Sequence, residues 1–139
     1  MIKHYYLKHK EIINYLIFGI LTTIINLLAY YLLVYTIFNP NKPIELQITN
    51  IISWLVAITF AYITNKKYVF NSKENKILKE IIKFYSSRLT TLFIEMLLMF
   101  IFVTLYNLND KFIKIIISII VIILNYLLSK LLVFKRKEN

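Results

Sequence analysis

Four long apolar segments constrain the fold of this chain more than any other feature of its sequence. They cover residues 12–38, 46–68, 84–106 and 112–134. Each is long enough to cross a bilayer, whose hydrocarbon core of about 30 Å needs roughly 20 residues of helix. Lipid cannot satisfy backbone N–H and C=O groups, so each segment must form its own hydrogen bonds as an α-helix. The sequence therefore predicts an all-α, polytopic membrane protein in which residues 1–139 form a single domain with four transmembrane helices.

Short polar segments separate the apolar ones. Residues 39–43 contain both prolines of the chain, and residues 107–110 contain Asn and Asp, so both segments favour turns over a continuous helix. The segment at residues 71–83 is longer and charged. Its apolar side chains recur at helical spacing and are Ile77, Leu78, Ile81 and Ile82. This spacing predicts a short amphipathic helix on the cytoplasmic membrane surface.

Composition excludes several other classes of protein. Hydrophobic residues make up 59% of the 139 residues, which is more apolar surface than a soluble domain of this size can bury. The chain has no Cys and one Gly, which rules out disulfides, thiolate metal sites and Gly-rich phosphate loops. Both histidines, His4 and His9, lie in the N-terminal segment, and Asp110 is the only Asp. We therefore expect no metal site, no cofactor and no enzymatic activity.

The distribution of basic residues predicts the orientation in the membrane. Of the 17 Lys and Arg residues, 14 lie in or beside the two termini and the loop at residues 71–83, while three, Lys42, Lys111 and Lys114, lie near the other two loops. The positive-inside rule places both termini and the central loop in the cytoplasm. Anionic lipid headgroups account for the formal net charge of +10. We therefore expect anionic lipids, and no nucleic acid, as partners.

A sequence repeat divides the chain into two similar halves. Residues 61–70 match residues 125–134, and residues 21–23 match residues 89–91. The matched pairs in the longer stretch include Tyr62 with Tyr126, Lys66 with Lys130, Val69 with Val133 and Phe70 with Phe134. The repeat predicts two duplicated, parallel helical hairpins, each ending in an aromatic and basic segment that we call the clasp (residues 62–70 and 126–134). Repeats in transporters often place a binding site between the halves.

The third apolar segment contains polar residues that are expensive to bury in a membrane. Arg88, Thr91 and Glu95 share one helical face. One interpretation is that the planar guanidinium of Arg88 binds a phosphate, and the alternative is that it extends to the lipid headgroups. Glu95 either belongs to a binding site or accepts a hydrogen bond from another helix, for example from Asn26.

Polar and small residues also follow single stripes on two other segments. The stripe on the fourth segment contains Lys114, Ser118, Asn125 and Ser129. Asn125 is deep enough to need a hydrogen-bonding partner, which is either another helix or a ligand. The stripe on the second segment contains Ser53, Ala57, Ala61 and Asn65. It permits close helix packing at Ala61, while Asn65 either caps its helix or binds a lipid headgroup.

Four short stretches follow one another along the chain: residues 15–19 (YLIFG), 65–70 (NKKYVF), 83–90 (KFYSSRLT) and 125–134 (NYLLSKLLVF), with Glu95 after the third. Through these stretches, in this order, the chain resembles the GtrA-like family of small four-helix membrane proteins over nearly its whole length. Two positions depart from the family pattern. Tyr68 stands where the family often has Trp, and Ser129 stands where it often has Asn or Arg, so the two clasps need not act identically.

The resemblance implies a role in glycosylating polymers of the bacterial cell envelope, such as teichoic acid or a polysaccharide. A membrane glycosyltransferase of the same pathway makes a polyprenyl-phosphate-linked sugar, and the GtrA-like protein is thought to move it across the cytoplasmic membrane. The family positions that matter most correspond here to Ala61, Asn65, Val69, Phe70, Phe84, Arg88, Lys114 and Asn125.

A lipid-linked sugar carries a phosphodiester anion, sugar hydroxyls and a long apolar tail, and the polar residues suit such a ligand. The residues expected to meet its phosphate or its sugar are Arg88, Lys66, Lys130, Lys114, Asn65, Asn125 and Glu95. Those expected to shape the entrance are Ala61, Val69, Phe70, Phe84 and Phe134. Because four helices make a thin wall around a groove, we also expect a homodimer or a larger homo-oligomer.

Two other functions compete with this one. A proton-coupled exporter of the small multidrug type also has four short helices and one membrane Glu, although a Glu close to an Arg suits an anion better. A non-transporting membrane partner of a glycosyltransferase would need the clasps but no polar groove.

Overall fold

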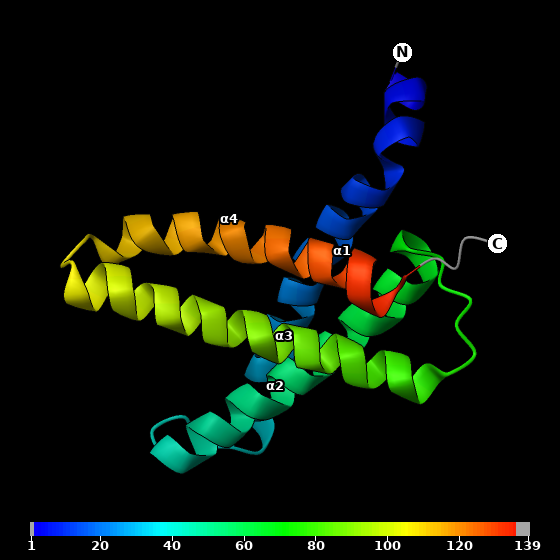
Figure 1. Cartoon of the computed structure of the whole chain (residues 1–139). Coiled ribbons are helices and arrows are strands. Elements are labelled where there is room, and N and C mark those ends of the chain that lie inside the picture. The colour runs from blue at the N-terminus through cyan, green and yellow to red at the C-terminus, as the bar shows by residue number, and fades with distance from the viewer. Residues whose placement is uncertain (1, 136–139) are drawn as a thin grey trace. The chain divides into compact units, whose positions relative to one another are not determined.

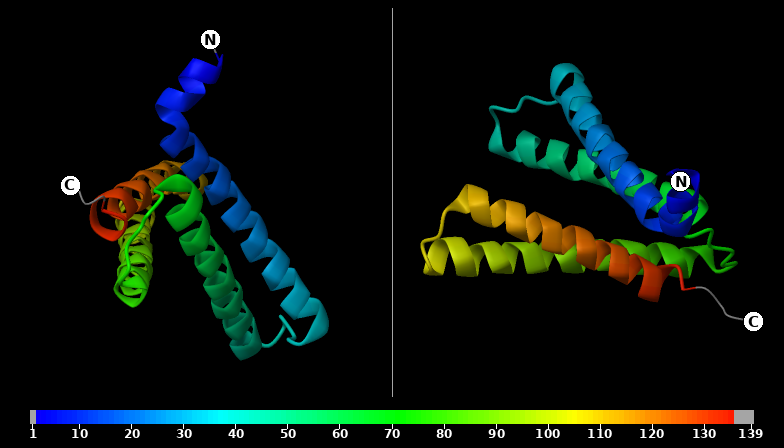
Figure 2. Two further views of the ribbon diagram at one scale, coloured as in Figure 1. Left: turned by 90° about the vertical axis from the view of Figure 1, so that its right-hand side faces the viewer. Right: turned by 90° about the horizontal axis from the view of Figure 1, so that it is seen from above.

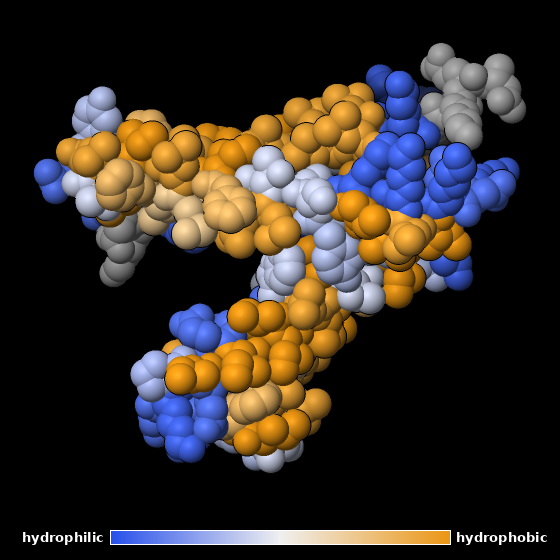
Figure 3. Space-filling model, turned by 60° about the horizontal axis from the view of Figure 1, so that its bottom comes forward, coloured by the Kyte–Doolittle hydropathy of each residue, from blue (hydrophilic) through white to orange (hydrophobic). Residues whose placement is uncertain are grey.

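The computed structural model describes residues 2–135, and in this part of the chain four long helices confirm the expected all-α architecture. They are α1 (Ile2–Thr36), α2 (Pro43–Thr64), α3 (Ile77–Met99) and α4 (Asp110–Leu128) (Figure 1). All four are long and apolar enough to cross a membrane. Figure 3 shows hydrophobic surface along the helices and hydrophilic surface near their ends, as expected for helices that face lipid.

The chain divides into two compact units with a boundary between Asn71 and Ser72. Each unit is a helical hairpin, formed by α1 with α2 and by α3 with α4. The structure therefore shows one hairpin for each half of the sequence repeat. The repeat also predicts that the two clasps lie side by side, because both hairpins are expected to point the same way.

The first helix is longer than expected and bends near its beginning. α1 starts at Ile2, about three turns before the first apolar segment, and His9 has non-helical backbone angles (φ −114°, ψ 17°). The bend is visible close to the N-terminus in Figure 2. The basic N-terminal turns of α1 therefore run at an angle to the apolar part of the helix that follows them.

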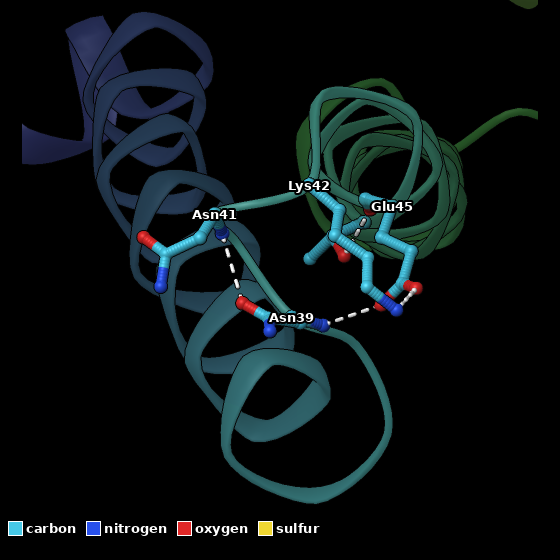
Figure 4. Close-up of polar contacts among 5 residues, drawn as sticks. Asn39, Asn41, Lys42 and Glu45 are labelled. Carbon is cyan, nitrogen blue, oxygen red and sulfur yellow. Dashed lines mark hydrogen bonds and ion pairs between the residues drawn. The ribbon is translucent and has the colours of Figure 1, made fainter.

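A polar network closes the loop between α1 and α2 (Figure 4). Lys42 Nζ donates to Glu45 Oε1 at 2.8 Å, and the N–H of Asn39 donates to Glu45 Oε2 at 2.7 Å. The Asn39 side chain in turn accepts from the N–H of Asn41 at 3.0 Å. The hydrogen bond to Glu45 raises the pKa of Lys42, so this lysine stays charged throughout the physiological pH range. Pro43 then begins α2, at a position where its missing N–H costs nothing.

Both clasps contain a π-helical turn, a rare element that is often found at functional sites. One turn, η1 (Asn65–Val69), follows α2, and another, η3 (Ser129–Val133), follows α4. The N–H of Phe70 bonds to the first carbonyl of η1 at 2.9 Å, and the N–H of Phe134 bonds to the first carbonyl of η3 at 2.8 Å. The two halves therefore repeat a backbone distortion as well as a residue pattern.

A π-helical turn and two asparagines shape the turn between the helices of the second hairpin. A further π-helical turn, η2 (Phe100–Leu105), extends α3. Asn107 then adopts a left-handed φ of 51°, which Asn tolerates better than most residues. The side chain of Asn109 accepts from the N–H of Phe112 at 3.1 Å and so caps the start of α4.

The expected separate amphipathic helix over residues 71–83 is wrong. Residues 71–76 are a connecting segment, and residues 77–83 are the first turns of α3. Glu80 is buried and accepts a hydrogen bond from Ser72 Oγ, which folds the connecting segment back onto the start of α3. Neither Gly nor Pro occurs between residues 77 and 99, so the helix continues into the apolar segment.

Candidate functional site

Arg88 lies on α3 over the aromatic ring of Phe84, one turn earlier. Its Cζ is 4.7 Å from the ring centroid, which is close enough for a cation–π contact. Phe84 is fully buried, with 0% exposure, and packs against Phe134 at a centroid distance of 5.8 Å. The ring beneath the half-buried guanidinium is therefore held by the packing of α3 against the end of η3.

One turn further along α3, a neutral hydrogen bond joins the two helices of the hairpin. The hydroxyl of Thr91 donates to Oδ1 of Asn125 on α4 at 2.8 Å. Thr91 is buried and Asn125 is half-buried, so water and lipid have little access to this contact. The structure thus supplies the interhelical partner that a deep Asn requires.

This contact leads to a prediction about the stability of the second hairpin. Thr91→Val and Asn125→Ala should each destabilise the protein, and a double-mutant cycle should give a coupling of about 0.6 kcal/mol and not above about 1.7 kcal/mol, the range found for hydrogen bonds between membrane helices. Reversible unfolding in mixed micelles measures the free energy of unfolding of the wild type, the two single variants and the double variant. Strictly additive effects would contradict the contact.

An ion pair links the same two helices nearer the η2 end. Nζ of Lys114 on α4 donates to Oε1 of Glu95 on α3. The two side chains are 54% and 21% exposed, so this pair is far more open than the contact of Thr91. The structure shows Lys114, on the other helix of the same hairpin, as a partner of Glu95; one of the two interpretations of the sequence was a donor on another helix, with Asn26 as the example. The long stem of a lysine allows it to reach inward from a helix end.

The polar faces of α3 and α4 therefore meet inside one hairpin. We call Arg88, Thr91, Glu95, Lys114 and Asn125 the polar stripe. All five residues of the polar stripe lie in the second half of the chain. The sequence repeat aligns them with residues of the first half that are mostly apolar. Those aligned residues are Ile20, Thr23, Leu27, Asn50 and Ala61. The first hairpin therefore has no counterpart of the two cations and the carboxylate.

The clasps share an arrangement that the sequence repeat alone did not reveal. In η1 the carbonyl of Tyr68 accepts from Nδ2 of Asn14 on α1 at 3.1 Å. In η3 the carbonyl of Leu132, the aligned position, accepts from Nζ of Lys83 on α3 at 3.5 Å. A π-turn leaves carbonyls that need partners, and in each hairpin the first helix supplies one. Asn14 was not among the expected site residues, because its partner is a backbone atom 54 positions away.

Each clasp also contains a buried polar atom for which no hydrogen-bond partner is found in the described part of the chain. These atoms are Oδ1 of Asn65 and Oγ of Ser129, whose residues are 4% and 0% exposed. Both residues begin a π-turn, and the repeat aligns them. Buried polar groups without partners are costly and infrequent in native proteins. Their recurrence at aligned positions therefore marks both clasps as candidate functional regions.

The remaining expected residues fall into two groups. Lys130 is exposed and lies on Tyr126, with Nζ 3.2 Å from the phenol oxygen, while Lys66 on η1 is half-buried. The expected entrance residues are all buried, and they are Ala61, Val69, Phe70, Phe84 and Phe134. Their side chains pack within the protein, and the ring contact between Phe84 and Phe134 is the clearest example.

Two further features of the described part of the chain concern a metal site and a surface hollow. No group of three or more His, Asp or Glu side chains there is placed to hold a metal ion. An open hollow of about 500 Å³ lies at the loop between α1 and α2, next to the network of Figure 4. It contains none of the expected site residues.

Comparison with known proteins decides the family. The family model described as GtrA/DPMS, transmembrane domain, matches residues 14–134. The chain belongs to this family. The GtrA-like resemblance expected from the sequence is thereby confirmed, and the chain is a multi-pass membrane protein.

Several relatives match this chain over most of its length. YwcD, an uncharacterized membrane protein of Bacillus subtilis strain 168, is 38% identical over 128 residues, which is 90% of this chain and 97% of YwcD. The cell wall teichoic acid glycosylation protein GtcA of Listeria monocytogenes serovar 1/2a is 35% identical over 133 residues, covering 92% of this chain and 87% of GtcA. GtcA of Listeria innocua is 36% identical with the same coverage. No solved structure matches the chain.

Proposed function

We propose that this protein moves a polyprenyl-phosphate-linked sugar across the bacterial cytoplasmic membrane for glycosylation of a cell-envelope polymer such as teichoic acid. The names of the Listeria relatives support the pathway. The polar stripe of the second hairpin supports the transport step. The proposal includes no catalytic step, because a separate glycosyltransferase would transfer the sugar at the outer surface.

The observation that carries the proposal is the half-buried Arg88 stacked on the buried Phe84. A guanidinium offers five donors in a fixed plane and binds phosphate oxygens in pairs. Next to it on the stripe, the amide N–H groups of the half-buried Asn125 and the carboxylate of Glu95 suit sugar hydroxyls. Exposed apolar side chains cover much of α3 and α4, so the polyprenyl tail can stay in lipid while the head follows the stripe.

The structure favours this function over a proton-coupled exporter of cations. In such an exporter, the membrane Glu must alternate between a proton and the substrate. Here Glu95 already accepts from Lys114, and Arg88 lies about 10 Å away along the helix, at 1.5 Å per residue. Cations on both sides of one carboxylate suit an anionic substrate.

Transport in proteoliposomes tests the proposal. The purified protein is reconstituted in neutral lipid with a radiolabelled polyprenyl-phosphoryl-glucose, and the fraction accessible to a membrane-impermeant reagent is followed over time. We expect the protein to accelerate equilibration across the bilayer, and a polyprenyl glucoside without phosphate to remain unaccelerated. Rates equal to those of protein-free liposomes would favour a non-transporting partner of the glycosyltransferase, and acceleration of a cationic dye alone would favour the exporter.

We also propose that both termini and the segment at residues 71–76 lie in the cytoplasm, because 14 of the 17 basic residues lie in or beside these regions. The chain has no Cys, so single-cysteine variants report the topology. Asn41→Cys and Leu108→Cys should react with an impermeant maleimide in intact cells, and Asn75→Cys should react only after permeabilisation. Leu108 is preferred to Asn109, which caps α4. Labelling of Asn75→Cys in intact cells would overturn this orientation.

The proposed partners are the lipid-linked sugar, anionic lipids and membrane glycosyltransferases of the same pathway. We further propose a homodimer, since the two helices that carry the stripe form only one wall of a groove. Cross-linking of the protein in native membranes measures the oligomeric state directly, and the same protein dissociated in detergent is the control.

A further inference from the structure

We propose that Glu95 is an internal counter-ion that the lipid phosphate displaces from Lys114, so that Lys114 is a second phosphate contact, distinct from Arg88. This inference rests on the proposed function and specifies how the phosphate moves along the stripe. It assigns opposite effects to two residues that form one ion pair.

The exposure of the pair is the first support. Lys114 and Glu95 are 54% and 21% exposed, so another anion can approach the ammonium group while both helices stay in place. The neighbouring Thr91, by contrast, is only 2% exposed and bonds to Asn125. The hairpin thus has one closed interhelical contact that suits a structural role and one open contact that suits exchange.

The balance of formal charge is the second support. Arg88 and Lys114 are cations and Glu95 is an anion, so the polar stripe carries a formal net charge of +1 without ligand. A polyprenyl-phosphate-linked sugar is a phosphodiester and brings one negative charge. Uncompensated charge is expensive at membrane depth. Glu95 offsets one of the two cations when the site is empty, and a bound phosphate brings the whole stripe to formal neutrality.

The third support is that the two cations, Arg88 and Lys114, lie at different positions along the hairpin. Arg88 and Glu95 are separated by two helical turns on the same face of α3, about 10 Å along the axis at 1.5 Å per residue. Lys114 reaches Glu95 from the η2 end of the hairpin. A phosphate that leaves Arg88 therefore meets a second cation further along the hairpin, and the return of Glu95 to Lys114 releases the phosphate there.

The first hairpin shows that the ion pair is not a requirement of the fold. The repeat aligns Glu95 with Leu27 and Lys114 with Asn50, which form no ion pair. α1 and α2 nevertheless pack as a hairpin and end in the same π-turn as the second half. An ion pair present in only one of two duplicated hairpins points to a role in the function of that hairpin.

Binding of a soluble analogue separates the counter-ion from a structural ion pair. The probe is citronellyl-phosphoryl-glucose, a short-chain phosphodiester, measured by titration calorimetry against the protein in phosphatidylcholine nanodiscs; citronellyl glucoside is the ligand control. Glu95→Gln should tighten binding of the probe, and Lys114→Gln should weaken it, each by roughly three- to tenfold. Binding by Glu95→Gln/Lys114→Gln should fall between these values, because the stripe again carries a formal charge of +1.

Each outcome has one meaning, and the melting temperature of every variant in the same nanodiscs shows that it is folded. If Glu95→Gln and Lys114→Gln both weaken binding, or both leave it unchanged, the pair is structural and the inference is wrong. In that case the proposed function survives if the wild type binds the probe and Arg88→Ala does not. If the wild type fails to bind the probe, both the proposed function and this inference are overturned.

Discussion

Arg88→Ala is expected to abolish envelope glycosylation while leaving the protein inserted in the membrane. The substitution removes the guanidinium that rests on Phe84 and leaves the hydrogen bond between Thr91 and Asn125 intact. Hydrogen bonds to a charged group contribute about 1.5–3 kcal/mol each, so the loss of one such contact should weaken phosphate binding roughly 10- to 150-fold. Lectin binding to the cell wall, in a host whose own copy of the gene is deleted, measures the effect.

Arg88→Lys is the matched variant for this prediction. It retains the positive charge and loses the planar pair of donors, so we expect intermediate glycosylation. Glu95→Gln should be milder than either, because Arg88 and Lys114, the two cations expected to bind the phosphate, both remain. Normal glycosylation by well-expressed Arg88→Ala would refute the anion-binding mechanism, and complete loss in Glu95→Gln alone would favour the proton-coupled exporter.

The second large effect is expected for Phe84→Ala. Phe84 has 0% exposure and contacts both Phe134 and the guanidinium of Arg88. Truncating a buried Phe costs on the order of 3 kcal/mol, and loss of the cation–π contact adds to this cost at a desolvated site. We expect a large fall in melting temperature together with loss of glycosylation, because Arg88 loses the ring that positions it.

Phe93→Ala is the control for Phe84→Ala. Phe93 lies on the same helix but is 67% exposed, so its removal should change the melting temperature little. A further variant, Phe134→Leu, disturbs the ring pair without touching Arg88, and it should lower stability more than it lowers phosphate binding. If Phe84→Ala and Phe93→Ala behave alike, the packing of Phe84 does not position Arg88.

Much of the candidate site was visible in the sequence because a membrane makes polar residues conspicuous. Arg88, Glu95 and Asn125 stand out in apolar segments, where each carries a cost unless it has a partner or a function. The same reasoning missed Asn14 and overstated residues 71–83. Asn14 lies near the start of the first apolar segment, where an Asn is unremarkable, and its partner is a carbonyl of η1. The charged residues at 71–83 suggested a separate surface helix, whereas the buried Glu80 ties Ser72 to the start of α3.

The sequence by itself determined the number of long helices, the turns that divide them within each hairpin, and the duplication. These features depend on the local length of apolar runs, on Pro and Asn at turns, and on residue identities that recur along the chain. Only the tertiary structure decided that Glu95 pairs with Lys114, that Thr91 pairs with Asn125, and that both clasps wind into π-turns. Pairing depends on the register of α3 against α4, and a shift of one residue turns a helical side chain by about 100°. In each hairpin a side chain of the other helix donates to a carbonyl of the π-turn, and no local pattern records that contact.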